Sequence, residues 1–146
     1  MSPATIFMAC SLFSGIGWIV LIFVSPYWKD FDKFLISVVI VVLALVYTGL
    51  NFSQPIMQTM KDFSNFEGVL RIFTNETLVN AAWVHFLTFD LFVGVWVKKD
   101  SLRQGISHAW IIPSLIFCCV FGPLGYLVYL LTRRIKSKTP GNASGF

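Results

Sequence analysis

The sequence predicts an all-α integral membrane protein: a bundle of four transmembrane helices, with a short amphipathic helix between the second and the third. Of the 146 residues, 56% are hydrophobic and only 12% are charged, and the mean hydropathy is +0.75. Soluble domains carry about 25% charged residues. The apolar residues also gather into four runs of about 20 residues, the length at which a helix crosses a bilayer. One membrane domain over residues 1–146 is therefore expected.

Each apolar run is predicted to be one spanning helix. The first run carries four small residues, Ser11, Ser14, Gly15 and Gly17, which would let a neighbouring helix pack closely. The second run is rich in Val, Ile and Leu, and its length favours a spanning helix over a buried strand. The predicted spans are residues 5–25, 34–52, 76–97 and 109–132, and the tail, 137–146, is predicted to be disordered.

The fourth run contains two prolines with different expected effects. Pro113 can occupy a first helical turn, where its missing N–H group has no cost. Pro123 lies deeper in the run, within the sequence FGPLG, and is expected to kink the helix and free the carbonyl group of Cys119. A neighbouring helix or water would then have to satisfy that oxygen.

Between the second and third runs, four large apolar side chains recur at intervals of three and four residues. This spacing predicts a short amphipathic helix that lies in the membrane interface or caps the bundle. The four residues are Phe63, Phe66, Leu70 and Phe73.

The net charge of +4 comes from clusters at the ends of apolar runs, where Lys and Arg anchor helices to lipid headgroups. Membrane lipid is thus the expected partner. Nucleic acid is not, because no basic stripe with interleaved aromatic residues is present. Two, two, three and four Lys or Arg residues follow the four runs in turn. With four crossings the two sides would receive six and five, and both termini are predicted to be cytoplasmic. The N-terminal residues show no transit peptide, which favours a bacterial inner membrane or a thylakoid-type membrane.

The third run, residues 76–97, carries polar side chains inside a stretch of spanning length: Asn80, His85, Thr88 and Asp90. A carboxylate near the centre of a spanning helix costs about 2.5–3.5 kcal/mol even on lenient insertion scales. Such residues usually mark a functional site or have a partner.

Asp90 and His85 are the candidate catalytic residues. A carboxyl group at that depth is expected to be protonated and able to donate a hydrogen bond or a proton. His85 lies five residues earlier, about 140° away around the helix, so the two cannot share one metal ion from this helix alone. They could instead meet opposite ends of one ligand that wraps around the helix. A polar, aromatic and small stripe includes Asp90 and runs along the same helix through Glu76, Asn80, Trp83, Leu87, Gly94 and Val97.

Structural roles for both residues remain as alternatives. Asp90 could pair with Tyr47, with a carbonyl group below Pro123, or with Arg103, and so fix helix packing. His85 could be a packing histidine. The sequence shows none of the hydrolase motifs GxSxG and HExxH, no phosphate-binding glycine loop, and no metal or cofactor motif.

The segment WVHFLTFDLFVG from Trp83 to Gly94, followed by Asp100, Pro113 and FGPLGYLVY, resembles the abscisic-acid-deficient-four-like family, whose plant members are neoxanthin-synthase-type proteins of chloroplast membranes. Val95 stands where a basic residue is expected in that family. The matching positions are Trp83, His85, Asp90, Leu91, Phe92, Gly94, Asp100, Gly122, Pro123 and Gly125. The stripe and these positions together give the predicted binding residues, which are Glu76, Asn80, Trp83, Phe92, Gly94, Asp100, Gly122, Pro123 and Gly125.

The resemblance implies a small four-span membrane protein of xanthophyll metabolism, whose plant reaction isomerises the epoxide violaxanthin to the allene neoxanthin. A carotenoid or another polyisoprenoid would be the ligand. The alternative is a non-enzymatic membrane protein that binds pigment or lipid or supports assembly of a complex. A third reading is a proton- or solute-conducting bundle, which with four spans would need a homo-oligomer to form a pore.

Overall fold

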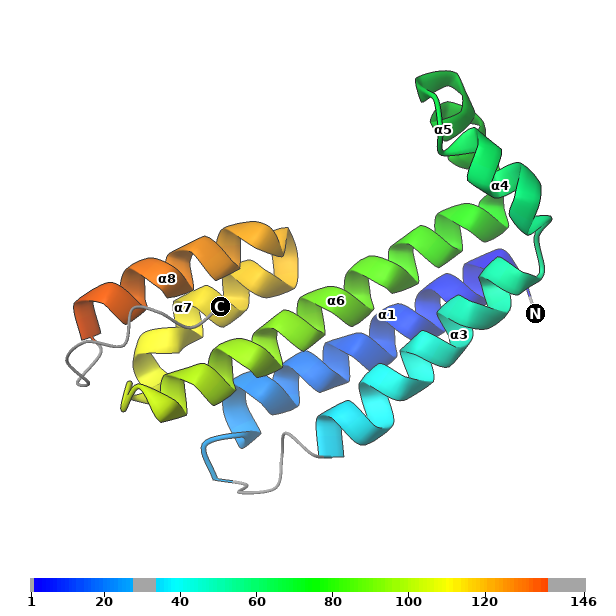
Figure 1. Cartoon of the computed structure of the whole chain (residues 1–146). Helices are drawn as coiled ribbons and strands as arrows, with labels where there is room; N and C mark the ends of the chain where they lie inside the picture. Colours follow the sequence, from blue (N-terminus) through cyan, green and yellow to red (C-terminus); the bar gives the residue numbers. More distant parts are fainter. Residues whose placement is uncertain (1, 28–33, 137–146) are drawn as a thin grey trace.

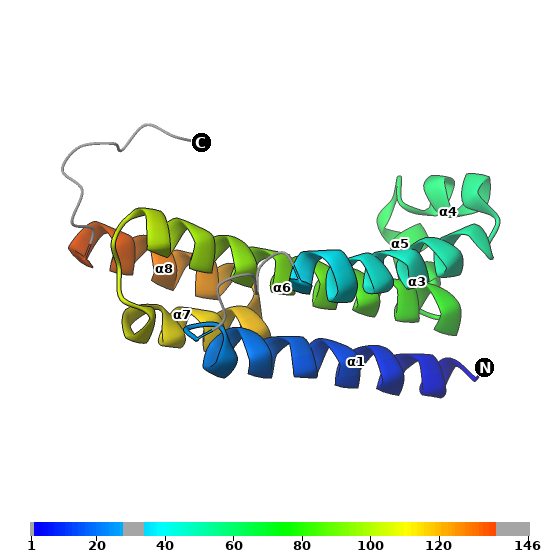
Figure 2. The ribbon, with the colours of Figure 1, turned by 90° about the horizontal axis from the view of Figure 1, so that it is seen from below.

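The computed structural model describes residues 2–27 and 34–136, and within these ranges it contains helices and connecting turns but no strand. Helix α6 is the longest element, and α1 and α3 run alongside it (Figures 1 and 2). The pair α4 and α5 lies at one end of α6, and the pair α7 and α8 lies beside the other end (Figure 1). The predicted disordered tail, 137–146, lies outside the described residues.

The first run forms α1, Pro3–Ile19, which continues without a break into the π-helical turn η1, Val20–Val24. The helix begins after Ser2, whose Oγ accepts a hydrogen bond from the Thr5 amide at 3.2 Å. Pro3 occupies the first helical turn, where a missing N–H group is tolerated. The Ser cap and the following Pro thus define the start of the helix.

The second run forms the π-helical turn η2, Ile36–Ile40, and then α3, Val41–Phe52. After α3 the chain bends by 93° into α4. The one amphipathic helix predicted next is in fact two short helices, α4, Ile56–Asp62, and α5, Phe66–Ile72. An ion pair of 2.7 Å between Arg71 and Asp62 joins them. Gly68 lies so close to the Asp62 backbone that no side chain would fit there.

The third run forms α6, Glu76–Arg103, which begins where predicted but extends past the predicted end at residue 97. Asn75 caps it, because its side-chain oxygen accepts hydrogen bonds from the amides of Thr77 and Leu78 at 2.9 and 3.2 Å. The charged residues after Val97 therefore belong to the helix and not to a connecting loop.

The prediction of one kinked helix over residues 109–132 is wrong. The chain forms α7, His108–Phe121, and α8, Pro123–Lys136, which lie antiparallel as a hairpin (Figure 1). The turn is made at Gly122, whose φ of +44° is open to glycine but strained for other residues. The roles of the two prolines are also reversed, since Pro123 starts α8 and Pro113 lies inside α7.

The hairpin is closed by contacts between its two arms. Ser114 of α7 donates a hydrogen bond of 2.7 Å to the carbonyl oxygen of Gly125 in α8. A Cβ atom at Gly125 would collide with the Cys118 backbone, so only glycine permits this approach. Nearer the open end, Lys136 of α8 lies 3.8 Å from the ring centroid of Trp110 in α7.

Glycines also allow the first helical run, η2 and α6 to pack closely against one another. A Cβ atom at Gly94 of α6 would lie 2.7 Å from the Trp18 ring and 2.8 Å from Leu21, both in the first helical run. Gly17 of α1 similarly faces Leu91 of α6 and Val39 of η2. Gly17 and the buried Ser14 thus pack against protein, in agreement with the expectation from the sequence, whereas a Cβ atom at Gly15 would have no neighbour within 4 Å.

Two helices are long and apolar enough to cross a membrane, Pro3–Val24 and Glu76–Arg103. A third crossing exists if Ser37–Phe52 and Ile56–Asp62 together count as one broken span. The four-span bundle is therefore not confirmed. Large apolar side chains remain exposed along the outer face of α1 and η1, at Leu12, Ile16, Ile19 and Phe23.

Candidate functional site

Asp90 lies in the middle of α6 and meets the turn of the α7–α8 hairpin. Its carboxylate is partly buried and lies directly beside Gly122, in the space where a side chain at position 122 would otherwise project. The glycine therefore serves two purposes: it allows the positive φ of the turn, and it makes room for the carboxylate. These two residues, 32 positions apart in the sequence, form the centre of the candidate site.

No hydrogen bond or ion pair to Asp90 is present among the described residues. None of the three structural partners considered from the sequence, Tyr47, Arg103 and the carbonyl groups below Pro123, binds it there. Tyr47 instead contacts His85. A partly buried carboxyl group without such a partner is costly in an apolar setting and remains available to a ligand.

His85 faces a different neighbour. Its ring centroid lies 5.4 Å from that of Tyr47 in α3 and 4.6 Å from that of Phe89 in α6. The two candidate catalytic residues thus point toward different helices, as their spacing predicts.

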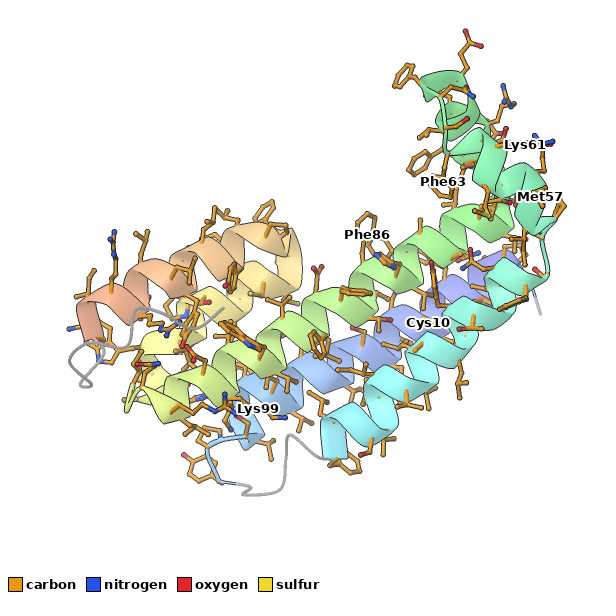
Figure 3. The ribbon with its side chains drawn as sticks, viewed as in Figure 1. Cys10, Met57, Lys61, Phe63, Phe86 and Lys99 are labelled. Carbon is orange, nitrogen blue, oxygen red and sulfur yellow. The ribbon has the colours of Figure 1, made fainter. Side chains whose placement is uncertain are left out.

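Aromatic side chains occupy the face of α6 between His85 and Asp90. On a helical wheel, Phe89 and Phe86 fall on the arc that separates the two polar residues. They are 55% and 56% exposed. Figure 3 shows Phe86 pointing away from α1 and α3, toward the side of α6 that lies between the two helix pairs. This face can offer apolar and aromatic contact flanked by an imidazole and a carboxyl group.

Three other predicted binding residues on α6 serve mainly to hold α1. Asn80 is buried and donates a hydrogen bond of 3.0 Å to the carbonyl oxygen of Pro3. Trp83 donates one of 2.8 Å to Ser11 and stacks on Phe7 at 5.1 Å. The space beside Gly94 is filled by Trp18 and Leu21 of the first helical run.

Glu76 is exposed at the start of α6. It lines, together with Asn80, a hollow of about 310 Å³ between the beginnings of α1 and α6. A second hollow, of about 400 Å³, lies along α1 itself. Neither hollow includes His85 or Asp90. The structure therefore separates Glu76 and Asn80 from the Asp90 site.

The remaining predicted binding residues divide between the hairpin and the outer surface. Pro123 and Gly125 shape the beginning of α8, beside the Asp90 site. Phe92 is 48% exposed on α6. Of the predicted set, only Gly122, Pro123 and Gly125 come together with Asp90 in one region.

Asp100 belongs to a separate polar cluster at the end of α6. Its carboxylate accepts a hydrogen bond of 2.5 Å from the hydroxyl group of Tyr129, a fully buried residue of α8. Arg133 of α8 lies 3.4 Å from the same oxygen. Trp96 packs edge-on against Tyr126 and Tyr129, at 5.4 and 5.9 Å. This cluster fastens α8 to α6 and leaves Asp100 committed to internal partners.

Two polar residues that the sequence reasoning missed bind carbonyl groups of the first helical run. Lys98 is only 5% exposed and donates a hydrogen bond of 2.5 Å to the Ser25 carbonyl oxygen. His108 Nε2 lies 2.8 Å from the Ile22 carbonyl oxygen. A signal for Lys98 was present, because it follows Gly94 by four residues and so shares the face that meets the first helix.

Within residues 2–27 and 34–136, no group of three or more His, Cys, Asp or Glu side chains is arranged to hold a metal ion. The site offers one acid, one imidazole and an aromatic surface. That set suits proton transfer on, or binding of, an extended apolar molecule that carries a polar group.

Comparison with known proteins supports a family assignment. The model of the ABA DEFICIENT 4-like family matches residues 5–129. The chain is also similar to the protein ABA DEFICIENT 4, chloroplastic, of Arabidopsis thaliana, with 28% identity over 106 residues. That alignment covers 68% of this chain and 47% of the plant protein, so the chain matches about half the length of its relative. No solved structure matches. Because the family model covers most of the sequence, the chain belongs to the ABA DEFICIENT 4-like family.

Proposed function

We propose that this membrane protein binds a carotenoid or a related polyisoprenoid against the aromatic face of α6 and isomerises it there. The observation that carries the proposal is the Asp90 carboxyl group, which lies against Gly122 without a hydrogen-bonding or ionic partner among the described residues. Family membership and helices of spanning length support a membrane setting for such a ligand. Exposed Phe86 and Phe89 supply surface on which a polyene can stack.

The chemistry that this pair suits is the opening of an epoxide to an allene. Asp90, as the protonated acid, gives its proton to the epoxide oxygen while the ring C–O bond breaks, so that a hydroxyl group forms. Neutral His85 removes a proton from the adjoining polyene carbon, and the electron pair of that C–H bond forms the new double bond. One proton is added and one is removed, so substrate and product are isomers. Transfer of the proton from His85 back to Asp90 restores the site.

The central test compares Asp90→Asn with the unchanged protein. The amide keeps the size of the side chain but cannot serve as the acid. In a membrane preparation supplied with an epoxycarotenoid such as violaxanthin, we expect conversion to the allene to fall by at least about 100-fold, a typical contribution of a general acid. His85→Gln should give a similar loss. Chromatography of the extracted pigments measures both.

Glu67→Gln provides the matched control, since Glu67 is an exposed carboxylate on α5, away from the site. It should retain full turnover. All variants are first compared for membrane content and thermal stability in detergent, so that loss of folding is distinguished from loss of chemistry. Full turnover by both Asp90→Asn and His85→Gln would refute the assignment.

The second candidate function is binding of the ligand without conversion. It is favoured because His85 and Asp90 point toward different helices. His85 packs on Tyr47 and Phe89, as a structural histidine would. If this candidate holds, protein purified in mild detergent from a carotenoid-producing host carries visible absorption but converts no epoxide. Co-purifying subunits without pigment would point instead to a role in assembly, and co-purification of a second copy to a homo-oligomer.

A further inference from the structure

The basic residues of the described chain gather at one end of the molecule. The last turns of α6 and α8 lie at the same end, opposite α4 and α5 (Figure 1). That end holds six Lys or Arg residues, and the opposite end holds two, Lys61 and Arg71. The six are Lys98, Lys99, Arg103, Arg133, Arg134 and Lys136.

The acidic residues have the reverse distribution. Among the described residues, Asp100 is the one carboxylate at the basic end, and Tyr129 and Arg133 contact it. The opposite end carries three carboxylates, Asp62, Glu67 and Glu76. Counted over residues 2–27 and 34–136, one end therefore has six basic residues and one acid, and the other end has two basic residues and three acids.

The hairpin creates this asymmetry. If residues 109–132 formed one spanning helix, the basic residues after α8 would lie on the side opposite Arg103. The antiparallel arms instead return the chain to the end from which α7 starts, as the contact between Lys136 and Trp110 shows. The nearly equal division of Lys and Arg between the two sides of the membrane, expected for four crossings, therefore does not occur.

We infer that the basic end faces the cytoplasmic leaflet and contacts anionic lipid headgroups there, while the beginning of α1 lies on the opposite side of the membrane. Lys and Arg near the ends of spanning helices are retained on the cytoplasmic side, and anionic headgroups attract them. When Ser37–Phe52 and Ile56–Asp62 are counted as one broken span, the chain crosses three times, and an odd number of crossings places the beginning of α1 and the end of α8 on different sides. This replaces the expectation of two cytoplasmic termini, which assumed four crossings.

The side chains at this end suit a headgroup surface. Arg103 and Arg134 are exposed, and Lys99 is partly buried. Trp110 is 53% exposed beside Lys136, the pairing of aromatic and basic groups that is typical of the membrane interface. Lys98 is not part of this surface, because it is buried against Ser25. This orientation follows from charge and topology and does not depend on the proposed ligand.

Labelling of single introduced cysteines tests the orientation. The background is Cys119→Ala, which removes the exposed native cysteine; Cys10 and Cys118 are buried. Ser64→Cys lies between α4 and α5, and Ser107→Cys lies between α6 and α7; both positions are exposed. With a membrane-impermeant maleimide on intact bacteria that express the protein, Ser64→Cys should react. Ser107→Cys should react only after the inner membrane is opened. Reaction of Ser107→Cys in intact cells, or protection of both positions, would overturn the proposal.

Charge variants test whether the basic residues determine the orientation of the protein in the membrane. Arg103→Gln combined with Arg134→Gln should raise labelling of Ser107→Cys in intact cells severalfold, whereas Lys61→Gln should leave it unchanged.

Binding of the lipid itself is tested by native mass spectrometry. Protein eluted with phosphatidylglycerol or phosphatidylcholine should retain several times more of the anionic lipid, phosphatidylglycerol. The double variant should lose this preference. Equal retention of both lipids, or an unchanged orientation in the double variant, would refute the role of these arginines.

Discussion

Helix α1 and its continuation η1 follow α6 along most of its length, whereas the α7–α8 hairpin contacts only the second half of α6. Contacts to the first run extend from Asn80, which binds the Pro3 carbonyl, to Lys98, which binds the Ser25 carbonyl. Contacts to the hairpin begin at Asp90, which lies beside Gly122, and end at Asp100, which binds Tyr129. The candidate site lies where the short contact begins.

The hairpin should be most sensitive at the point where its arms approach most closely. Gly125→Ala places a methyl group against the Cys118 backbone, which cannot move aside as a flexible side chain can. We expect a loss of about 3 kcal/mol or more in the stability of the hairpin, at the upper end of overpacking effects. Hydrogen exchange in detergent should show faster exchange in α7 and α8, with α1 still protected.

Gly15→Ala is the matched control for this experiment, because no atom lies within 4 Å of the added methyl group. It should leave the exchange pattern unchanged. Equal loss of protection in α1 and in the hairpin after Gly125→Ala would show that the two contacts are not independent.

The contact between α1 and α6 should respond next. In Gly94→Ala the methyl group would meet the Trp18 ring at 2.7 Å and Leu21 at 2.8 Å, and side chains can yield where backbone cannot. A loss of about 1–3 kcal/mol is expected. Thermal unfolding in detergent, followed by circular dichroism, measures it. Gly49→Ala, another position without neighbours within 4 Å, should unfold at the same temperature as the unchanged protein or slightly above.

The smallest effect should come from the polar attachment of α8. Tyr129→Phe removes the hydroxyl group that binds Asp100 but keeps the buried ring beside Trp96. Because Arg133 still faces the carboxylate, we expect a loss of about 1 kcal/mol. The readout is the same hydrogen-exchange experiment, with Tyr27→Phe, which alters an exposed tyrosine, as the control. Destabilisation as large as that of Gly125→Ala would mean that polar contacts, and not close packing, hold the hairpin.

The part of the fold that periodicity determines was predictable from the sequence. Helix α6 begins at Glu76 as expected, and His85 and Asp90 point to different neighbours because helical geometry alone fixes the angle between them. The all-helical fold and the close packing at Gly17 also followed from local composition.

The hairpin was missed because residues 109–132 have the length and composition of a single span. The signal for a break was nevertheless present, since a glycine followed by a proline combines a helix end with a helix start. Gly122 and Pro123 fill those two roles. The pairing of Asp100 with Tyr129 could not be read from the sequence, because it depends on where the turn returns the chain.

The carbonyl groups at the end of the first helical run bear on the order of assembly. Ile22 and Ser25 find their polar partners, His108 and Lys98, more than seventy residues later in the chain. During synthesis these oxygens must be hydrated or otherwise bound until α6 and the first residue of α7 have been made. The C-terminal end of the first helical run is thus expected to reach its final packing late, after the ribosome has released the segment that carries Lys98 and His108.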